Sequence, residues 1–181
     1  MQILLGKNHF EVFQLPIRFD VDQGLISERY RELQKTLHPD KFVNASDQEQ
    51  RLSMQQTALV NESFQVLKSP LLRAKYLLEL KGVNFSEKSE QLDPAFLMEQ
   101  LELREAIENI SEQEDPFGSL TEIQSHIEQQ VRDMIENLRA YFESDQDDLI
   151  KYTKEMVLKL QFLQKLLSET ERLEDTLVHE L

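Results

Sequence analysis

Helix-breaking residues are scarce in this sequence, and their scarcity constrains the fold more than any other feature. Only 4 Gly and 5 Pro occur among 181 residues, and long stretches between them are rich in Leu, Glu and Gln, which favour helices. Sandwiches, barrels and glycine-loop enzymes need more turn residues than this, so the sequence predicts an all-α protein. The length accommodates one substantial core or two small ones.

The composition excludes several classes of function. The chain has no cysteine, which removes thiol catalysis, disulfides, Cys-ligated zinc and cysteine-held iron–sulfur clusters. The net charge of −14 disfavours nucleic acid and anionic membranes as partners. No apolar run is long enough to span a bilayer, and the N-terminus lacks the pattern of a signal peptide, so we expect a cytoplasmic protein.

The charges are distributed unevenly, which indicates two modules. Residues 1–75 contain ten Lys and Arg against nine Asp and Glu, whereas residues 76–181 contain ten against 25. A polar, glycine-containing stretch, KGVNFSEKSE, follows the first of these regions. We therefore expect an N-terminal module over 1–80, a connector over 81–93 and a C-terminal module over 94–181.

The N-terminal module is predicted to be an antiparallel helical hairpin with short flanking helices. A brief aromatic helix precedes Pro16, and an amphipathic helix follows over 25–37. The second hairpin helix is expected to begin with Asp47 as its N-cap. A fourth helix is expected to begin at Ser69-Pro70 and to end at Gly82.

The amphipathic helix over 25–37 has a basic face and runs directly into His38-Pro39-Asp40. Arg31 and Lys35 lie opposite its apolar stripe, and Arg29 lies on the flank of that stripe. Pro39 prevents the helix from continuing and favours an extended conformation at His38. The Asp40 carboxylate follows the negative end of the helix dipole, so it is free to receive a cationic partner. Taken alone, the tripeptide also fits an ordinary Pro-Asp turn.

The C-terminal module is predicted to be an antiparallel three-helix bundle, with helices over about 94–113, 119–143 and 146–178. The middle helix has one broad apolar stripe, whereas the other two have a second apolar surface each. In the first helix the core stripe is Phe96, Leu103, Ile107 and Ile110, and the second surface is Leu97, Met98 and Leu101. In the last helix the core stripe is Leu149, Tyr152, Met156, Leu160, Leu163 and Leu167, and the second is Leu158, Phe162 and Leu166. Periodicity alone leaves open whether the second surfaces are interior or bind a partner.

The order of elements over residues 9–78 resembles the J-domain of DnaJ-type co-chaperones. The segments that carry the resemblance are HFEVFQLP, SERYRELQKTLHPDK, FVNASDQE, LVNESFQVLKSP and LLRAKYLL. It implies that His38, Pro39 and Asp40 trigger ATP hydrolysis in a DnaK-class chaperone. It also implies that four cations dock on an acidic face of that ATPase: Arg29, Arg31, Lys35 and Lys41. A J-protein acts by binding one state of its partner, so we expect an activator with no catalytic residues, metal ligands or cofactor of its own.

Two further segments, PAFLMEQLELREAIENI and LQFLQKL, together with the order of the modules, are similar to the HscB family. Members of this family are J-proteins of iron–sulfur cluster assembly, and the resemblance covers nearly the whole chain. It implies that the bundle binds the scaffold protein IscU and delivers it to the chaperone HscA. The residues implied in IscU binding are Leu97, Met98, Leu101, Glu102, Glu105 and Phe162. The segment 115–130 matches the family pattern only loosely.

Two other functions stay open at this point. One is a J-protein for a general DnaK-type chaperone with another client. The other is an acidic helical scaffold without chaperone activity, in which His-Pro-Asp is accidental; the basic face beside the tripeptide argues against it. An enzyme is disfavoured, because the sequence offers no phosphate-binding loop, no His pair at i, i+4 and no nucleophile with a base.

Overall fold

The computed structural model describes residues 4–85, 92–144 and 150–179, and these residues form helices and no strand. The all-α prediction is confirmed. The chain divides into two compact units, Met1–Val83 and Asn84–Leu181. This division falls within the stretch 81–93 that we expected to be a connector, although residues 86–91 of that stretch lie outside the described residues.

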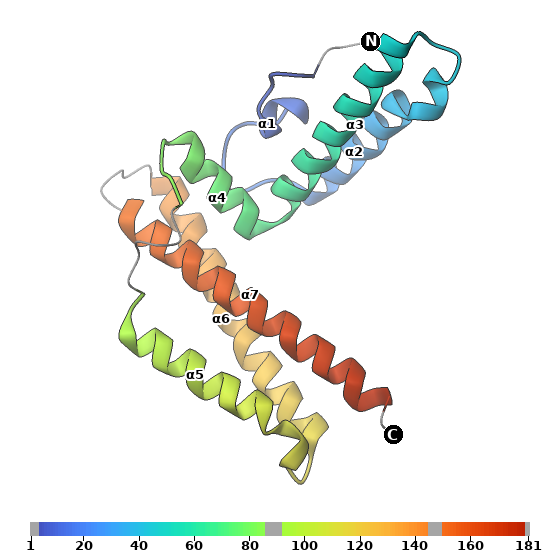
Figure 1. The fold of residues 1–181 in the computed structure, drawn as a ribbon. Helices are drawn as coiled ribbons and strands as arrows, with labels where there is room; N and C mark the ends of the chain where they lie inside the picture. The colour runs from blue at the N-terminus through green and yellow to red at the C-terminus, as the bar shows by residue number, and fades with distance from the viewer. Residues whose placement is uncertain (1–3, 86–91, 145–149, 180–181) are drawn as a thin grey trace. The chain divides into compact units, whose positions relative to one another are not determined.

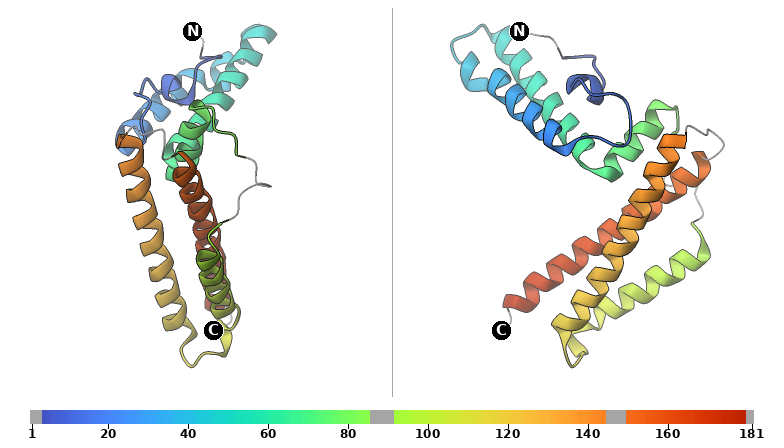
Figure 2. Two further views of the ribbon diagram at one scale, coloured as in Figure 1. Left: turned by 90° about the vertical axis from the view of Figure 1, so that its left-hand side faces the viewer. Right: turned by 180° about the vertical axis from the view of Figure 1, so that it is seen from behind.

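The first unit is a helical hairpin with short flanking helices. Its helices are α1 (His9–Val12), α2 (Gln23–Leu37), α3 (Asp47–Lys68) and α4 (Pro70–Leu80), and a 3-10 turn spans Pro39–Phe42 between α2 and α3. Helices α2 and α3 lie side by side in both figures (Figures 1 and 2). The core contains fully buried side chains from all four helices and the loops, including Phe10, Phe13, Ile26, Val60, Leu67 and Leu78.

Helix α1 ends earlier than the sequence indicates. We expected Pro16 to terminate it, but its last helical residue is Val12. Gln14 adopts a positive φ of 52°, and the Leu15 N–H donates to the Phe10 carbonyl at 2.8 Å. A residue in the left-handed region followed by this hydrogen bond closes the helix before proline is reached.

The start of α3 also differs from the prediction. Ser46 is the N-cap, and the predicted N-cap Asp47 is the first helical residue. The Ser46 hydroxyl accepts from the Glu49 N–H at 3.4 Å, and the Glu49 carboxylate accepts from the Ser46 N–H at 3.0 Å. The side-chain hydrogen bond from Ser46, followed by the backbone one, lowers the pKa of Glu49. The prediction for α4 is confirmed, since Ser69 caps its start and Gly82, with a φ of 82°, follows its end.

The second unit is a three-helix bundle, as predicted. It contains α5 (Pro94–Glu108), a 3-10 turn at Ile110–Glu112, α6 (Pro116–Ser144) and α7 (Ile150–His179). Helices α6 and α7 run side by side over much of their length (Figure 1). All three helices contribute to one core cluster of buried residues, which consists of Phe96, Ile107, Ile127, Leu163 and Leu166.

Three details of the bundle correct the predictions. Helix α6 begins at Pro116 rather than near 119, because the Asp115 carboxylate accepts from the Gly118 N–H at 2.9 Å and caps the first turn. In α7, Leu166 is buried and so belongs to the core rather than to a second surface. Tyr152, which we placed in the core stripe, is 64% exposed, and its neighbour Thr153 is buried instead.

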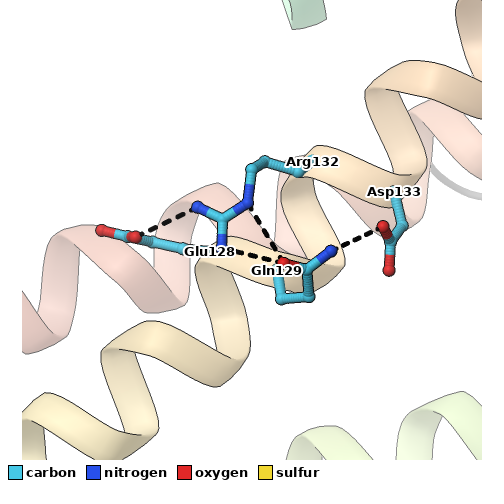
Figure 3. A network of polar contacts seen from close by, with 4 residues as sticks. All are labelled: Glu128, Gln129, Arg132 and Asp133. Carbon is cyan, nitrogen blue, oxygen red and sulfur yellow. Dashed lines mark hydrogen bonds and ion pairs between the residues drawn. The ribbon is translucent and has the colours of Figure 1, made fainter.

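One exposed stretch of α6 carries a network of charged and amide side chains (Figure 3). Arg132 donates to Glu128 at 3.3 Å and to Gln129 at 3.0 Å, and Gln129 donates to Asp133 at 2.8 Å. These pairs lie three and four residues apart, the spacing at which helix side chains meet. The network therefore satisfies these groups within α6 itself.

Candidate protein-binding sites

The end of α2 presents His38 and Asp40 in a tight turn. His38 is extended, with φ −55° and ψ 128° as predicted, and Pro39 begins the 3-10 turn. The Asp40 N–H donates to His38 Nδ1 at 3.3 Å, and one Asp40 carboxylate oxygen lies 3.5 Å from the same nitrogen. The Lys41 N–H donates to the His38 carbonyl at 3.0 Å. Both side chains are open to solvent, since those of His38 and Asp40 are 54% and 85% exposed.

Four of the predicted chaperone-docking residues meet in one open depression. It is lined by Gln34, Lys35, His38, Asp40 and Lys41. Lys35 and Lys41 are exposed, and neither has an ion-pair partner among the described residues. The two lysines can bind acidic groups of a partner protein, and the exposed Asp40 carboxylate can bind a cation on the same partner.

Arg29 and Arg31 do not line this depression. The Arg29 guanidinium donates to the carbonyl of Phe13 and, at 2.8 Å, to that of Gln14. It thereby holds the end of α1 against α2, a contact that periodicity did not indicate. Arg31 is exposed, and its Nε donates to the Ser27 carbonyl one turn earlier at 3.2 Å. Arg31 therefore extends the basic face along α2, whereas Arg29 has a structural contact.

Helix α3 supports the turn through side chains that the sequence analysis missed. The hydroxyls of Ser53 and Thr57 both donate to the Leu37 carbonyl, at 2.7 and 3.2 Å. Ser53 lies seven residues before the buried Val60, so a heptad reading of α3 could have placed it on the buried face. Apolar periodicity does not indicate Ser53, because serine is a polar residue.

The second candidate site is an apolar surface on the bundle. Leu97, Met98 and Leu101 of α5 are 45%, 61% and 53% exposed, and Phe162 of α7 is 44% exposed. The predicted second surface of α5 is therefore outside the core, while Phe96 on the same helix is buried. Two further predicted residues, Glu102 and Glu105, are exposed on α5. We call Leu97, Met98, Leu101 and Phe162 the apolar patch.

Phe162 is held in place by its contact with α5. Its ring meets the buried Phe96 ring edge-on, with the centroids 6.5 Å apart and the planes at 77°. The Lys159 ammonium lies 5.3 Å from the centre of the Phe96 ring. Because aromatic pairs prefer this edge-on geometry, the contact gives Phe162 a defined orientation at the surface. Phe96 of α5 therefore links Phe162 of α7 to the helix that bears the other members of the apolar patch.

No group of three or more His, Cys, Asp or Glu among the described residues is arranged to hold a metal ion. No helix in this part of the chain is both long and apolar enough to cross a membrane.

A helical hairpin with His-Pro-Asp at its turn, joined to a three-helix bundle, defines a J-domain protein with a C-terminal bundle. Comparisons with known proteins agree with this class. The family model described as the HSCB C-terminal oligomerisation domain matches residues 92–171. A co-chaperone protein HscB homolog from Shewanella halifaxensis is 44% identical over 171 residues, which are 94% of this chain and 98% of the relative. Another from Shewanella pealeana is 42% identical over 172 residues, covering 94% and 99%.

Solved structures give the same result. Chaperone HscB from Vibrio cholerae has a TM-score of 0.86 at 38% identity, covering 94% of this chain and 99% of that one. The human co-chaperone protein HscB has a TM-score of 0.84 at 26% identity, covering 94% and 83%. The chain belongs to the HscB family of co-chaperones.

Proposed function

We propose that this protein is a two-ended adaptor of iron–sulfur cluster assembly in the cytoplasm. Its first unit engages HscA through the His-Pro-Asp loop and stimulates ATP hydrolysis. Its second unit binds IscU and delivers it to HscA, which assists cluster maturation and transfer. Holding both partners on one chain raises the effective concentration of IscU at the chaperone. The protein itself is an activator of a partner ATPase and needs no bound cofactor, membrane or nucleic acid.

The chaperone-binding end is supported by the exposed groups at the end of α2. His38, Asp40, Lys35 and Lys41 meet in one depression, and Arg31 extends the positive charge along the helix. Such a surface attracts the protein to an acidic face of the ATPase and fixes its orientation when it docks. Because a J-protein supplies no catalytic base to the ATPase, the effect on hydrolysis arises from preferential binding to the competent state of HscA.

The proposal that the second unit binds IscU rests on one observation, the exposure of the apolar patch. Its four side chains are between 44% and 61% exposed, although the adjacent bundle core buries Phe96, Leu163 and Leu166 to 9% or less. Leu and Met adapt to a partner surface, and a Phe that packs edge-on against a buried ring is suited to be an anchor. The exposed carboxylates of Glu102 and Glu105 add orientation and favour a basic contact surface on IscU.

Two sets of substitutions test the adaptor. His38→Gln is expected to abolish stimulation of HscA while leaving the Kd for IscU unchanged. Replacing Leu97, Leu101 and Phe162 together with alanine is expected to weaken IscU binding while sparing stimulation of HscA alone. The control is Arg132→Ala, which removes a cation from the separate α6 network and should change neither property. Loss of both properties from one folded variant contradicts the modular adaptor, and binding of DnaK and unfolded clients instead of HscA and IscU favours a general J-protein.

A further inference from the structure

Helix α2 ends differently from the other two helices of its unit that are followed by loops. After α1 and α4, Gln14 and Gly82 adopt positive φ and donate their N–H groups back to the helix. The equivalent position after α2 is Pro39, which has no N–H to donate. The His-Pro sequence therefore removes the amide that bonds the second-last carbonyl group of α1 and of α4.

Two hydroxyls of α3 bind the last carbonyl group of α2, that of Leu37. Ser53 donates to the Leu37 carbonyl at 2.7 Å, and Thr57 donates to the same oxygen at 3.2 Å. Leu37 is 3% exposed and Ser53 is fully buried, so this carbonyl lies where an unpaired acceptor is costly. Ser53 and Thr57 reach one oxygen because residues four apart lie on the same face of a helix.

The Leu37 carbonyl controls the direction in which the chain leaves α2. Its oxygen belongs to the peptide plane that joins Leu37 to His38, so the two hydroxyls fix the orientation of that plane. The hydrogen bonds from the Asp40 and Lys41 amides to His38 then build the turn from this starting point. The geometry of the His-Pro-Asp loop thus depends on two side chains of α3.

We propose that Ser53 and Thr57 are positioning residues for the His-Pro-Asp loop, an inference that rests on the proposed stimulation of HscA. Neither residue contacts HscA in this account. They keep the loop in the conformation that binds, and a partner that binds only that conformation has an apparent Kd that rises as its population falls. Saturating concentrations restore the full effect, so the affinity changes while the maximal effect does not.

Ser53→Ala tests this proposal, with Ser63→Ala as the matched control. Both serines are fully buried on α3, but Ser63 is hydrogen bonded to His9 Nδ1 at 2.8 Å and not to the end of α2. Ser53→Ala is expected to raise the concentration that gives half-maximal stimulation of HscA by up to about fivefold, at an unchanged maximal rate. Ser63→Ala should leave both values unchanged at a similar loss of thermal stability. Equal stimulation curves for the two variants overturn the proposal.

A second measurement does not depend on HscA. Hydrogen exchange of the Asp40 and Lys41 amides, followed by NMR, should be faster in Ser53→Ala than in Ser63→Ala, because only the former frees the loop. If Ser53→Ala does not fold, Thr57→Ala is compared in its place, with a smaller expected change because its bond is longer. Equal exchange at these amides refutes the positioning role. Absence of stimulation by the wild-type protein refutes the proposed function instead, and the exchange result still decides the role of the two hydroxyls.

Discussion

Replacing Leu101 with alanine is expected to weaken IscU binding while leaving the bundle stable. Leu101 is 53% exposed, so about half of its side chain stabilises the fold and the other half is available to a partner. Full burial of a leucine is worth about 2 kcal/mol, so each half corresponds to about 1 kcal/mol. We therefore expect about a fivefold increase in the Kd for IscU and a loss of at most about 1 kcal/mol in the free energy of unfolding.

Leu163→Ala is the matched control for this prediction. Leu163 is 1% exposed in the core of the same unit, so its truncation leaves a cavity and should lower the free energy of unfolding by about 3 kcal/mol. Calorimetric titration with IscU measures Kd, and urea denaturation measures stability. If Leu101→Ala destabilises the bundle as much as Leu163→Ala, or leaves the Kd for IscU unchanged, Leu101 does not belong to a binding surface.

Three predictions concern the stability of the first unit. Burial lowers the pKa of the partly buried His9, against the opposing effects of Glu62 and Glu79. The unfolded chain therefore binds more protons below about pH 6.5, so acidification from about pH 7.5 to about pH 5.5 should lower the urea midpoint, and His9→Gln should reduce this dependence. Ser46→Ala removes the N-cap of α3 and should cost about 1 kcal/mol in urea denaturation; no change would mean that the cap is dispensable. Gly82→Ala should lower the melting temperature, since φ is 82° there and a side chain costs about 1 kcal/mol in that conformation; an unchanged melting temperature contradicts this.

Helical periodicity predicts most of this fold because burial follows the turn angle of the helix. Ile26 and Leu37 are buried on one side of α2, and Leu97 and Leu101 lie outside the core on α5, as the spacing indicates. The starts of α4 and α5 could also be predicted, because serine or aspartate precedes proline at each of them. The start of α6 at Pro116 follows the same rule and could have been predicted from the Asp-Pro pair.

Apolar periodicity fails where polar side chains are buried or where contacts join distant segments. Thr153 occupies a buried position near the start of α7, which moves the core stripe away from Tyr152. Ser53 can be buried because its hydroxyl donates a hydrogen bond to the Leu37 carbonyl at the end of α2. The Arg29 guanidinium bonds to the Gln14 carbonyl, a contact that depends on how α1 packs against α2. Lys35, His38, Asp40 and Lys41 are close in sequence, so the end of α2 and the following turn bring them together locally. The support of this turn by Ser53 and Thr57 depends on tertiary structure.

The most direct test of the adaptor is single-turnover ATP hydrolysis by HscA with this protein, measured with and without IscU. We expect stimulation that requires His38, since His38→Gln should remove it, and that increases more than additively when IscU is present. If folded wild-type protein leaves the rate of HscA unchanged, or if IscU does not enhance the stimulation, the protein is not a two-ended adaptor.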